Sequence, residues 1–211
     1  MEYLHWKECT ITDFSESNIS DLYNKGFVFT RIGKGVMHQT RSVRVDLSKF
    51  ELSSENRRIL RKGENTLMKK IALPYSDYSW EIGKMAKVFY DTKAGGAFSV
   101  NKIKELITTE YNFNTLLDFS ERGYAICYEN KEVLHYCYPF YDLKVSAKDM
   151  GLIMMTKAIV EAKEKGLEYA YLGSLQRSND VYKLQFSGLE WFDGNEWSKD
   201  IEKVKMILIN E

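Results

Sequence analysis

The sequence predicts an α+β fold with a mixed central sheet, and a strand–helix–strand unit in its second half carries that prediction. Residues 133–142 form an aromatic run of strand-favouring side chains. Ser146 then begins a helix, with Asp149 as its capping-box partner, and the helix ends at Gly166. Residues 167–173 read as the second strand. A strand, a helix and a strand of these lengths form a βαβ crossover whose strands run parallel.

Pro139 interrupts the first of these strands. Proline has no N–H to donate to a neighbouring strand, so it marks a bulge, an edge or a place where two strands part. Helix N-termini at the ends of parallel strands also attract anions. These two features predict a binding cleft beside Pro139 and Ser146, and an edge strand without a function is the alternative.

Further elements complete the predicted sheet around the crossover. Residues 1–20 are polar and are predicted to be irregular, a short helix ends at Gly26, and Ser53 caps another. The turn Asp193-Gly194 is typical of a hairpin between the last two strands. The remaining predicted helices cover residues 76–92, 101–108 and 178–186, and the remaining strands cover 27–31, 42–46, 116–119, 124–128, 189–192 and 203–209.

Composition limits the classes of protein that the chain can represent. Its 211 residues are 44% hydrophobic, which is enough for a packed core. The three cysteines, Cys9, Cys127 and Cys137, form no Cys-x-x-Cys or Cys/His cluster, so a reducing compartment is expected and a structural zinc site is not. The first residues are too polar for a signal peptide, and no apolar run approaches the ~18 residues of a membrane span. We therefore expect a cytoplasmic protein without a membrane partner.

Positive charge gathers in one part of a chain whose formal net charge is zero. Between Arg31 and Lys70 there are eleven Lys and Arg residues against four acids, a local excess of seven. Four of these cations, Arg57, Arg58, Arg61 and Lys62, lie on the helix that Ser53 begins. Such segregation fits binding to a phosphate backbone, and a solvated basic helix is the alternative.

The order of the elements resembles the GNAT acyltransferase fold, whose fourth and fifth strands splay apart around the acyl donor. Coenzyme A users of that fold carry an Arg/Gln-x-x-Gly-x-Gly/Ala loop whose backbone N–H groups hold the pyrophosphate. The corresponding residues 144–151 contain one glycine, and Asp149 would repel a phosphate. Another acyl donor is therefore expected.

Several short motifs follow one another along most of the chain. They are residues 22–27, Arg44-Val45 with Phe50, Ser54 and Arg57-Arg58, then Gly95-Gly96, residues 140–142, Gly151, residues 171–173, Tyr182-Lys183 with Phe186, and Glu190. In this order they resemble the arginyl-tRNA–protein transferases, including the compact bacterial aspartate/glutamate leucyltransferases. Two family features differ here. The cysteines that precede its Arg-Val block are replaced by residues 37–40, so a metal or iron–sulfur site is not expected, and its Phe-Arg-Arg is reduced to residues 29–31.

The resemblance implies an enzyme that moves an amino acid, Arg or Leu, from its tRNA ester to the α-amine of an acceptor. The expected acceptor is a protein whose first residue is Asp or Glu. An aminoacyl ester is already activated, so no cofactor is expected. The acceptor amine, with a pKa near ~8, must lose a proton, and the oxyanion that forms needs hydrogen-bond donors.

Roles for individual residues follow from this resemblance. Three residues are predicted to be catalytic: Tyr182 would relay a proton, Lys183 would bind a carboxylate or phosphate, and Asp142 would orient an amino group. Their alternatives are a half-buried aromatic, a surface cation and a strand-end cap. His38 and His135 each look isolated in the sequence, so neither is expected to be catalytic. The residues predicted to bind tRNA or substrate are Arg44, Arg57, Arg58, Arg61, Lys62, Gly95, Gly96, Tyr138, Tyr141, Ser146 and Tyr171.

Two domains are predicted, a basic N-terminal subdomain over residues 1–72 and a GNAT-like aminoacyltransferase domain over residues 73–211. Two other functions stay open at this point. One is a coenzyme A-dependent N-acyltransferase of the same fold, and the other is a non-catalytic relative that binds tRNA or acidic N-termini.

Overall fold

A computed structural model describes residues 3–96, 98–120, 122–144 and 148–210. The chain divides into two compact units that are each assembled from separate stretches. The first unit comprises Met1–Ser54, Asn130–His135 and Glu161–Glu211, and the second comprises Glu55–Glu129 and Tyr136–Val160. The boundary expected at residues 72 and 73 stays a prediction. No helix in the described part of the chain combines the length and the apolar character needed to cross a membrane.

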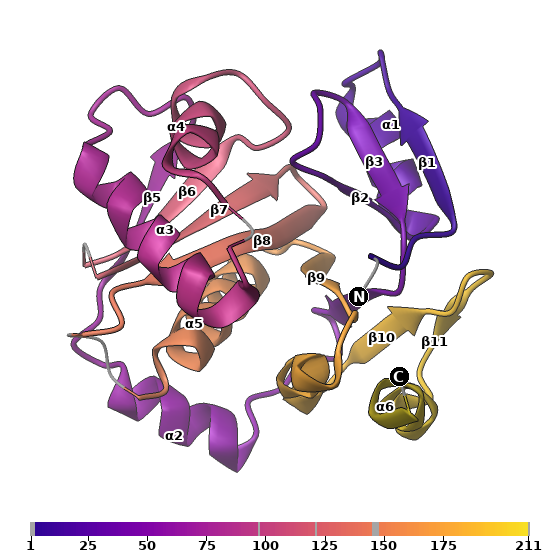
Figure 1. The fold of residues 1–211 in the computed structure, drawn as a ribbon. Coiled ribbons are helices and arrows are strands. Elements are labelled where there is room, and N and C mark those ends of the chain that lie inside the picture. Colours follow the sequence, from indigo (N-terminus) through magenta and orange to yellow (C-terminus); the bar gives the residue numbers. More distant parts are fainter. Residues whose placement is uncertain (1–2, 97, 121, 145–147, 211) are drawn as a thin grey trace. The chain divides into compact units, whose positions relative to one another are not determined.

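Two β-sheets and several helices form the fold, which confirms the predicted α+β class with a large mixed sheet (Figure 1). The smaller sheet has three strands in the order β1-β3-β2. The larger sheet has eight strands in the order β11-β10-β4-β9-β8-β7-β6-β5. Both antiparallel and parallel pairs occur in the larger sheet.

The three-stranded sheet belongs to the first unit and includes two strands that the polar sequence did not reveal. These strands are β1 (Lys7–Thr10) and β3 (Val36–Gln39), which pair with each other antiparallel. The third strand, β2 (Phe27–Phe29), pairs with the other side of β3. Helix α1 (Glu16–Asn24) leads into β2 through Gly26, whose φ of +80° lies in the left-handed region.

The first unit also carries one end of the larger sheet. Strand β4 is buried along its whole length, between β9 on one side and β10 on the other, and both pairs are antiparallel. The predicted turn at Asp193-Gly194 is present, but it joins β10 to β11 and not to a strand over residues 203–209. The elements of this part are β4 (Ser42–Asp46), β9 (Tyr169–Ser174), the 3₁₀ segment η1 (Ser178–Gln185), β10 (Leu189–Phe192), β11 (Trp197–Ser198) and α6 (Ile201–Asn210).

The strand predicted over residues 203–209 is wrong, because α6 occupies these residues. Alternate apolar side chains at Val204, Met206 and Leu208 indicated a strand. In the structure Val204 and Leu208 are buried while Met206 is exposed. Buried positions four residues apart are the repeat of a helix with one face toward the core.

In the second unit, helices cover both faces of the sheet. The Tyr90 ring of α3 contacts Phe140 on β8, and Phe140 contacts Tyr124 on β7. A Cβ built on Gly123 of β7 would lie 2.8 Å from the sulfur of Met154 on α5. Neighbouring residues of a strand point to opposite faces, so α3 and α5 cover opposite faces of β7. The bounds are α2 (Ser54–Lys62), β5 (Met68–Ala72), α3 (Trp80–Ala94), α4 (Val100–Thr108), β6 (Thr115–Phe119), β7 (Gly123–Glu129), β8 (Val133–Tyr141) and α5 (Met150–Glu164).

Strands β8 and β9 pair in parallel, and α5 lies between them in the chain. The register joins Val133 to Tyr169, Leu134 to Ala170 and His135 to Tyr171. Among the described residues, the paired positions of these two strands end there, although β8 runs on to Tyr141 and β9 to Ser174. The hydrogen-bonded part of this parallel pair is therefore short.

Candidate active site

Arg44 lies at the centre of a buried polar cluster in the first unit. The antiparallel registers place Glu190 of β10 opposite it on one side and Tyr171 of β9 opposite it on the other. The guanidinium donates from Nε and one terminal nitrogen to Oε2 of Glu190, at 3.0 and 2.9 Å. Its other terminal nitrogen donates to Oδ1 of Asn24 at 3.0 Å and to the Tyr171 hydroxyl at 3.2 Å. The side chains of Arg44 and Glu190 are only 7% and 9% exposed.

Two aromatic rings enclose the same guanidinium. Its central carbon lies 3.8 Å from the centroid of the Tyr169 ring and 3.9 Å from that of the Trp197 ring. Such stacking adds cation–π attraction to the ion pair. Arg44 was predicted to bind tRNA or substrate, and in the structure its hydrogen-bonding groups are directed at neighbours within its own unit. A contact between Arg44 and RNA stays a prediction.

Tyr171 connects the arginine cluster to two further buried side chains. Burial raises the pKa of Tyr171 to about 12, although the charge and hydrogen bond of Arg44 oppose that shift. The Tyr171 ring packs edge-on against Tyr23, with centroids 4.8 Å apart. The Tyr23 hydroxyl in turn lies 2.8 Å from Nδ1 of His135. His135 is thus part of a network, and the sequence-based view of it as isolated is wrong.

Lys183, predicted to be catalytic, lies on η1 and is held by two acceptors. Its ammonium donates to the carbonyl oxygen of Ser174 at 2.8 Å and pairs with Oδ1 of Asp180 at 2.9 Å. The side chain is 12% exposed. Burial by itself would lower the pKa of Lys183, but Tyr182 and Asp180 outweigh it, and the pKa is raised. Lys183 therefore stays a cation near neutral pH and is suited to bind an anion rather than to act as a base.

Tyr182 precedes Lys183 and presents its side chain to solvent. The residue is 42% exposed, and the Lys183 ammonium lies 5.8 Å from the centroid of its ring. A phenol in this position is accessible to a ligand. The proton-relay role of Tyr182 stays a prediction.

The beginning of the described chain lies against the segment that follows β9. The Tyr3 hydroxyl is 3.2 Å from Oγ of Ser174. The backbone N–H of Leu4 donates to Oε1 of Gln176 at 2.7 Å, and Nε2 of Gln176 donates to the Leu4 carbonyl at 3.0 Å and to Oγ1 of Thr40 at 2.9 Å. Gln176 therefore joins the N-terminal segment to Thr40, the residue that follows β3.

Three predicted site residues of the second unit lie at the end of β8. Tyr138 packs edge-on against Phe98 and Phe113, with centroids 5.1 and 5.4 Å away, and Tyr141 packs against Phe89 at 4.8 Å. These contacts show that both tyrosines have a packing role. The Asp142 carboxylate accepts the backbone N–H of Lys144 at 2.8 Å, which is the contact of a strand-end cap. Their roles in binding or orienting substrate stay predictions.

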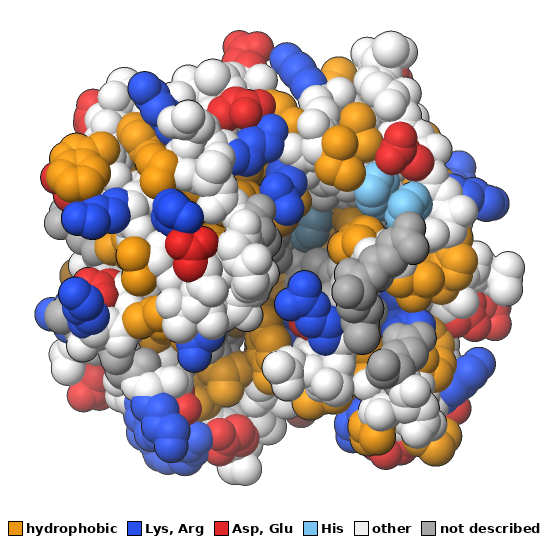
Figure 2. All heavy atoms as spheres, viewed as in Figure 1, with side chains coloured by type: hydrophobic (Ala, Val, Ile, Leu, Met, Phe, Trp, Pro, Cys, Tyr) orange, Lys and Arg blue, Asp and Glu red, His pale blue; other side chains and the backbone are white. Residues whose placement is uncertain are grey.

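The basic helix α2 is present, but ion pairs neutralise half of its four cations. Arg58 makes a bidentate pair with Glu55, and Lys62 pairs with Asp149 at 2.5 Å. Arg57 and Arg61 are exposed, lie one turn apart and have no ion pair within the described residues. Figure 2 shows basic and acidic side chains side by side where Figure 1 places α2. The free positive charge of this helix is therefore smaller than the sequence indicates.

The glycine pair ends α3. Gly95 has a φ of +64° and is the C-cap of that helix, and Gly96 has a φ of +82°. A Cβ built on Gly95 would meet nothing within 4 Å, so its backbone conformation rather than close packing calls for glycine. Ser146, the remaining predicted site residue, lies outside the described residues.

The predicted site residues fall into both units. Arg44 and Tyr171 share a hydrogen bond in the first unit, where Lys183 is bonded to Ser174 at the end of β9 and lies beside Tyr182. Sequence reasoning missed Asp180 and Gln176. The three-residue spacing of Asp180 and Lys183 was an available signal, because such pairs meet on a helical segment. Nothing in the sequence links Gln176 to Leu4.

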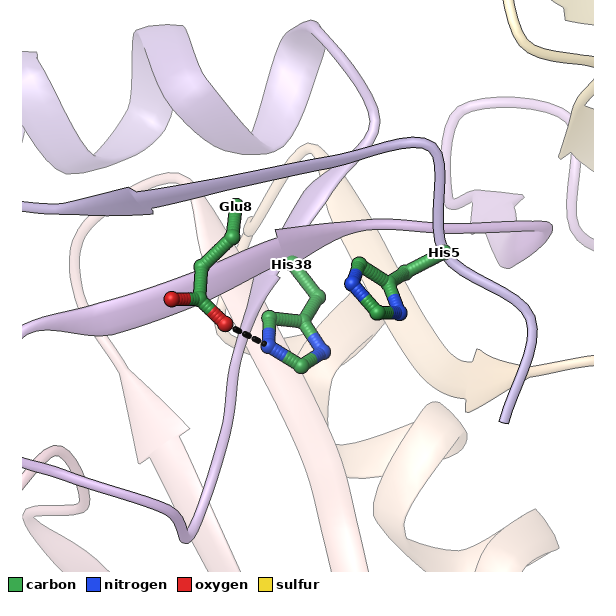
Figure 3. Close-up of side chains that lie close together, drawn as sticks. All are labelled: His5, Glu8 and His38. Atoms are coloured by element: carbon green, nitrogen blue, oxygen red, sulfur yellow. Dashed lines mark hydrogen bonds and ion pairs between the residues drawn. The ribbon is translucent and has the colours of Figure 1, made fainter. Parts of the chain in front are cut away.

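The structure also corrects the view of His38 as isolated. Its Nε2 lies 2.8 Å from Oε2 of Glu8, and its ring stacks on His5 with centroids 4.4 Å apart (Figure 3). The rings of His5 and His38 face each other, while Glu8 approaches His38 from the other side. These three residues are the ones that could hold a metal ion among the described side chains.

Curated proteins of one kind are similar to this sequence, although no family model matches it. An aspartate/glutamate leucyltransferase of Ruegeria pomeroyi is 26% identical over 166 residues, which cover 74% of this chain and 60% of the relative. Another of the same name, from Ruegeria sp. (strain TM1040), is 38% identical over 63 residues, or 29% of this chain and 23% of the relative. The matched part of the chain thus spans about 60% or less of the length of these relatives.

Two solved structures align with this chain at low similarity. L-PGS from Bacillus licheniformis has a TM-score of 0.44 at 16% identity, over 92% of this chain and 69% of the other. A GCN5-related glucosamine N-acetyltransferase region of a fungal GH3 β-N-acetylglucosaminidase has a TM-score of 0.47 at 9% identity, over 87% of this chain and 22% of the other. Both TM-scores lie below 0.5, so neither neighbour bears on function. The curated homologues of this chain are thus named aspartate/glutamate leucyltransferases, which agrees with the family that its sequence motifs resemble.

Proposed function

We propose that this protein is an aminoacyltransferase that takes an amino acid, Leu or Arg, from its tRNA ester and joins it to the α-amine of an acceptor. The proposed acceptor is a protein or peptide that begins with Asp or Glu. The observation that carries the proposal is the similarity over 74% of the chain to a curated aspartate/glutamate leucyltransferase. The motifs named above lie within a chain of the same α+β class that the family resemblance implied.

The first unit supplies groups suited to this reaction. Lys183 is a largely buried cation. Among the described residues two acceptors occupy its ammonium, so one of its three N–H groups can bind a substrate. A carboxylate, a phosphate or a developing oxyanion is the kind of group that this N–H attracts. Tyr182 offers an accessible hydroxyl next to it for a proton in transit.

The buried network around Arg44 would support these groups rather than touch substrate. Tyr171 joins Arg44 to Tyr23, and Tyr23 joins His135. A rigid, satisfied network of this kind fixes the register of β4 and β9, and Ser174 at the end of β9 holds Lys183. In this proposal Arg44 and Tyr171 position the site, and the direct contacts to RNA come from Arg57 and Arg61.

A transfer assay with charged tRNA tests the proposal. The protein is incubated with radiolabelled leucyl-tRNA or arginyl-tRNA and with matched peptides that begin with Asp, Glu or Gly. Label is expected on the Asp and Glu peptides and not on the Gly peptide. Peptides with a blocked α-amine are the control, because they retain the side chain but lack the attacking nitrogen.

The other outcomes point to different functions. Transfer from acetyl-coenzyme A without transfer from any charged tRNA would replace the proposal with a coenzyme A-dependent N-acyltransferase. Binding of tRNA or of acidic peptides without any transfer would indicate a non-catalytic relative.

A further inference from the structure

His5, Glu8 and His38 gather on one face of the three-stranded sheet, and the strand register explains why. Glu8 of β1 and His38 of β3 are direct cross-strand partners, so their side chains emerge on the same face. His5 lies just before β1 and reaches the same place from the N-terminal segment (Figure 3). One potential ligand atom from each residue lies within 4.8 Å of those of the other two.

His38 is a buried histidine whose hydrogen bonding is incomplete. The residue is 4% exposed, and its Nε2 is bonded to Glu8. Its Nδ1 is buried and has no hydrogen-bond partner in the described structure. An ion that replaces the contact with Glu8 would bind Nε2 and leave Nδ1 as it is, so the cross-strand placement of His38 and Glu8, and not the unsatisfied atom, supports a site here.

His5 is arranged as ligand histidines usually are. Its Nδ1 lies 3.3 Å from the backbone carbonyl oxygen of Tyr3. Donation of an Nδ1 proton to that carbonyl leaves Nε2 with a free lone pair, which is the tautomer that binds metal. The second histidine of the cluster thus already has the outer contact that orients a metal-bound imidazole.

We propose that His5, Glu8 and His38 bind a divalent transition-metal ion of the zinc class. Two imidazoles and one carboxylate are borderline ligands that suit Zn²⁺ and its Irving–Williams neighbours better than Mg²⁺ or Ca²⁺. The site has three protein ligands, so a fourth position is open to water or to a donor atom of a ligand.

The present spacing needs a small adjustment to hold the ion. A tetrahedral zinc with bonds of about 2.0–2.2 Å brings its donors to roughly 3.4 Å of one another. Glu8 and His5 are exposed and can rotate inward, while the buried His38 stays fixed. The ion would then replace the direct contact between Glu8 and His38. Cys9 does not join, because it follows Glu8 on β1 and points to the opposite face.

The ion would link the N-terminal segment, through His5, to strand β3, through His38. His5 follows directly on Tyr3 and Leu4, whose contacts reach Ser174 and Gln176. A loaded site would therefore stabilise the segment that lies beside the acceptor of Lys183. This inference does not depend on the proposed transferase activity.

Cobalt and zinc binding to the untagged chain of 211 residues tests the site. The chain has three histidines, so His135 is the only other imidazole and is buried. Co²⁺ is titrated by visible absorption, Zn²⁺ is titrated by displacement of Co²⁺, and thermal unfolding is followed with and without Zn²⁺. The variants are His5→Ala and Glu8→Gln, both at exposed positions, with Glu16→Gln as a matched exposed-carboxylate control.

Saturable binding of one ion is expected, with an affinity at least about tenfold lower in His5→Ala and in Glu8→Gln and unchanged in Glu16→Gln. Zn²⁺ should raise Tm of the wild type and of Glu16→Gln, and a chelator should reverse that rise. The proposal is overturned if the wild type shows no saturable binding, or if both variants bind as tightly as the wild type. Because His38 is buried, a His38→Gln variant is compared only if its far-UV circular dichroism spectrum matches that of the wild type, which shows that it folds.

Discussion

The hydroxyl of Tyr23 lies 2.8 Å from Nδ1 of His135, and both side chains are buried. Burial lowers the pKa of His135 from 6.5 to about 3, and the positive charge of Lys183 contributes to the shift. The folded protein therefore keeps this imidazole neutral at a pH where the unfolded chain protonates it. Between about pH 6.5 and 3 the unfolded state binds the extra proton, so His135 makes stability fall as the pH falls through that range.

The contribution of His135 can be isolated with a His135→Gln variant. Unfolding free energies of the wild type and the variant are measured by urea titration from pH 7.5 down to the lowest pH at which both fold. The unfolding free energy of the wild type minus that of the variant should decrease as the pH falls below 6.5, by up to about 1.4 kcal/mol per pH unit. The other ionisable side chains are the same in both proteins, so this difference isolates the effect of His135. A difference that stays constant with pH would contradict a neutral, buried His135.

Removing the charge of Glu190 should strongly destabilise the protein. Glu190→Gln leaves the buried guanidinium of Arg44 without its carboxylate, and breaking a buried ion pair in this way costs about 3–5 kcal/mol. Urea unfolding should show a lower midpoint with an unchanged slope. Arg58→Ala is the matched control, because its pair with Glu55 is solvent-exposed and should contribute at most about 1 kcal/mol. Equal losses in the two variants would mean that burial of the Arg44 pair has no energetic consequence.

Tyr182→Phe should separate catalysis from stability. The hydroxyl is on an exposed ring, so its removal should leave Tm within error of the wild type. If the hydroxyl relays a proton, kcat for transfer from charged tRNA should fall about a hundredfold or more, with little change in KM. Tyr75→Phe, at another tyrosine of the chain, serves as the control for loss of a phenol. An unchanged kcat would remove Tyr182 from the proposed mechanism.

Two exposed arginines of α2 should dominate the salt dependence of tRNA binding. Arg57→Gln with Arg61→Gln should weaken binding and lower the slope of log K against log salt by about two. Arg58→Gln should change the slope less, because Glu55 already neutralises that guanidinium. Fluorescence anisotropy at several salt concentrations measures both effects. An identical slope in the double variant would place the RNA on another surface.

The sequence predicted most of the elements that carry a clear periodic pattern or a clear stop. Gly26 ends α1 and Asp193-Gly194 forms a hairpin, as expected from glycine at positive φ. Strand β5 was missed because exposed Lys69 and Lys70 interrupt its pattern, as charges often do on an edge strand. For α6, the alternation of Val204, Met206 and Leu208 indicates a strand, and only the burial of Val204 and Leu208 without Met206 reveals the helix.

The candidate site was predictable only in part, for a related reason. Motif order singled out Arg44, Lys183 and Glu190 but not their contacts. Arg44 meets Glu190 because β4 and β10 share a register, although the residues are 146 positions apart in the chain. His5 and His38 look isolated for the same reason, since only the pairing of β1 with β3 brings Glu8 beside His38.

The chain passes between the two compact units after Ser54, Glu129, His135 and Val160, and the last two passages lie inside β8 and α5. A gene fragment with one start and one stop therefore cannot encode the first unit by itself. During synthesis, β4 also cannot pair with β9 until β9 has been made, more than a hundred residues later. Late, long-range pairing of this kind slows folding, so we expect the nascent N-terminal third to depend on protection from aggregation until the C-terminal strands emerge.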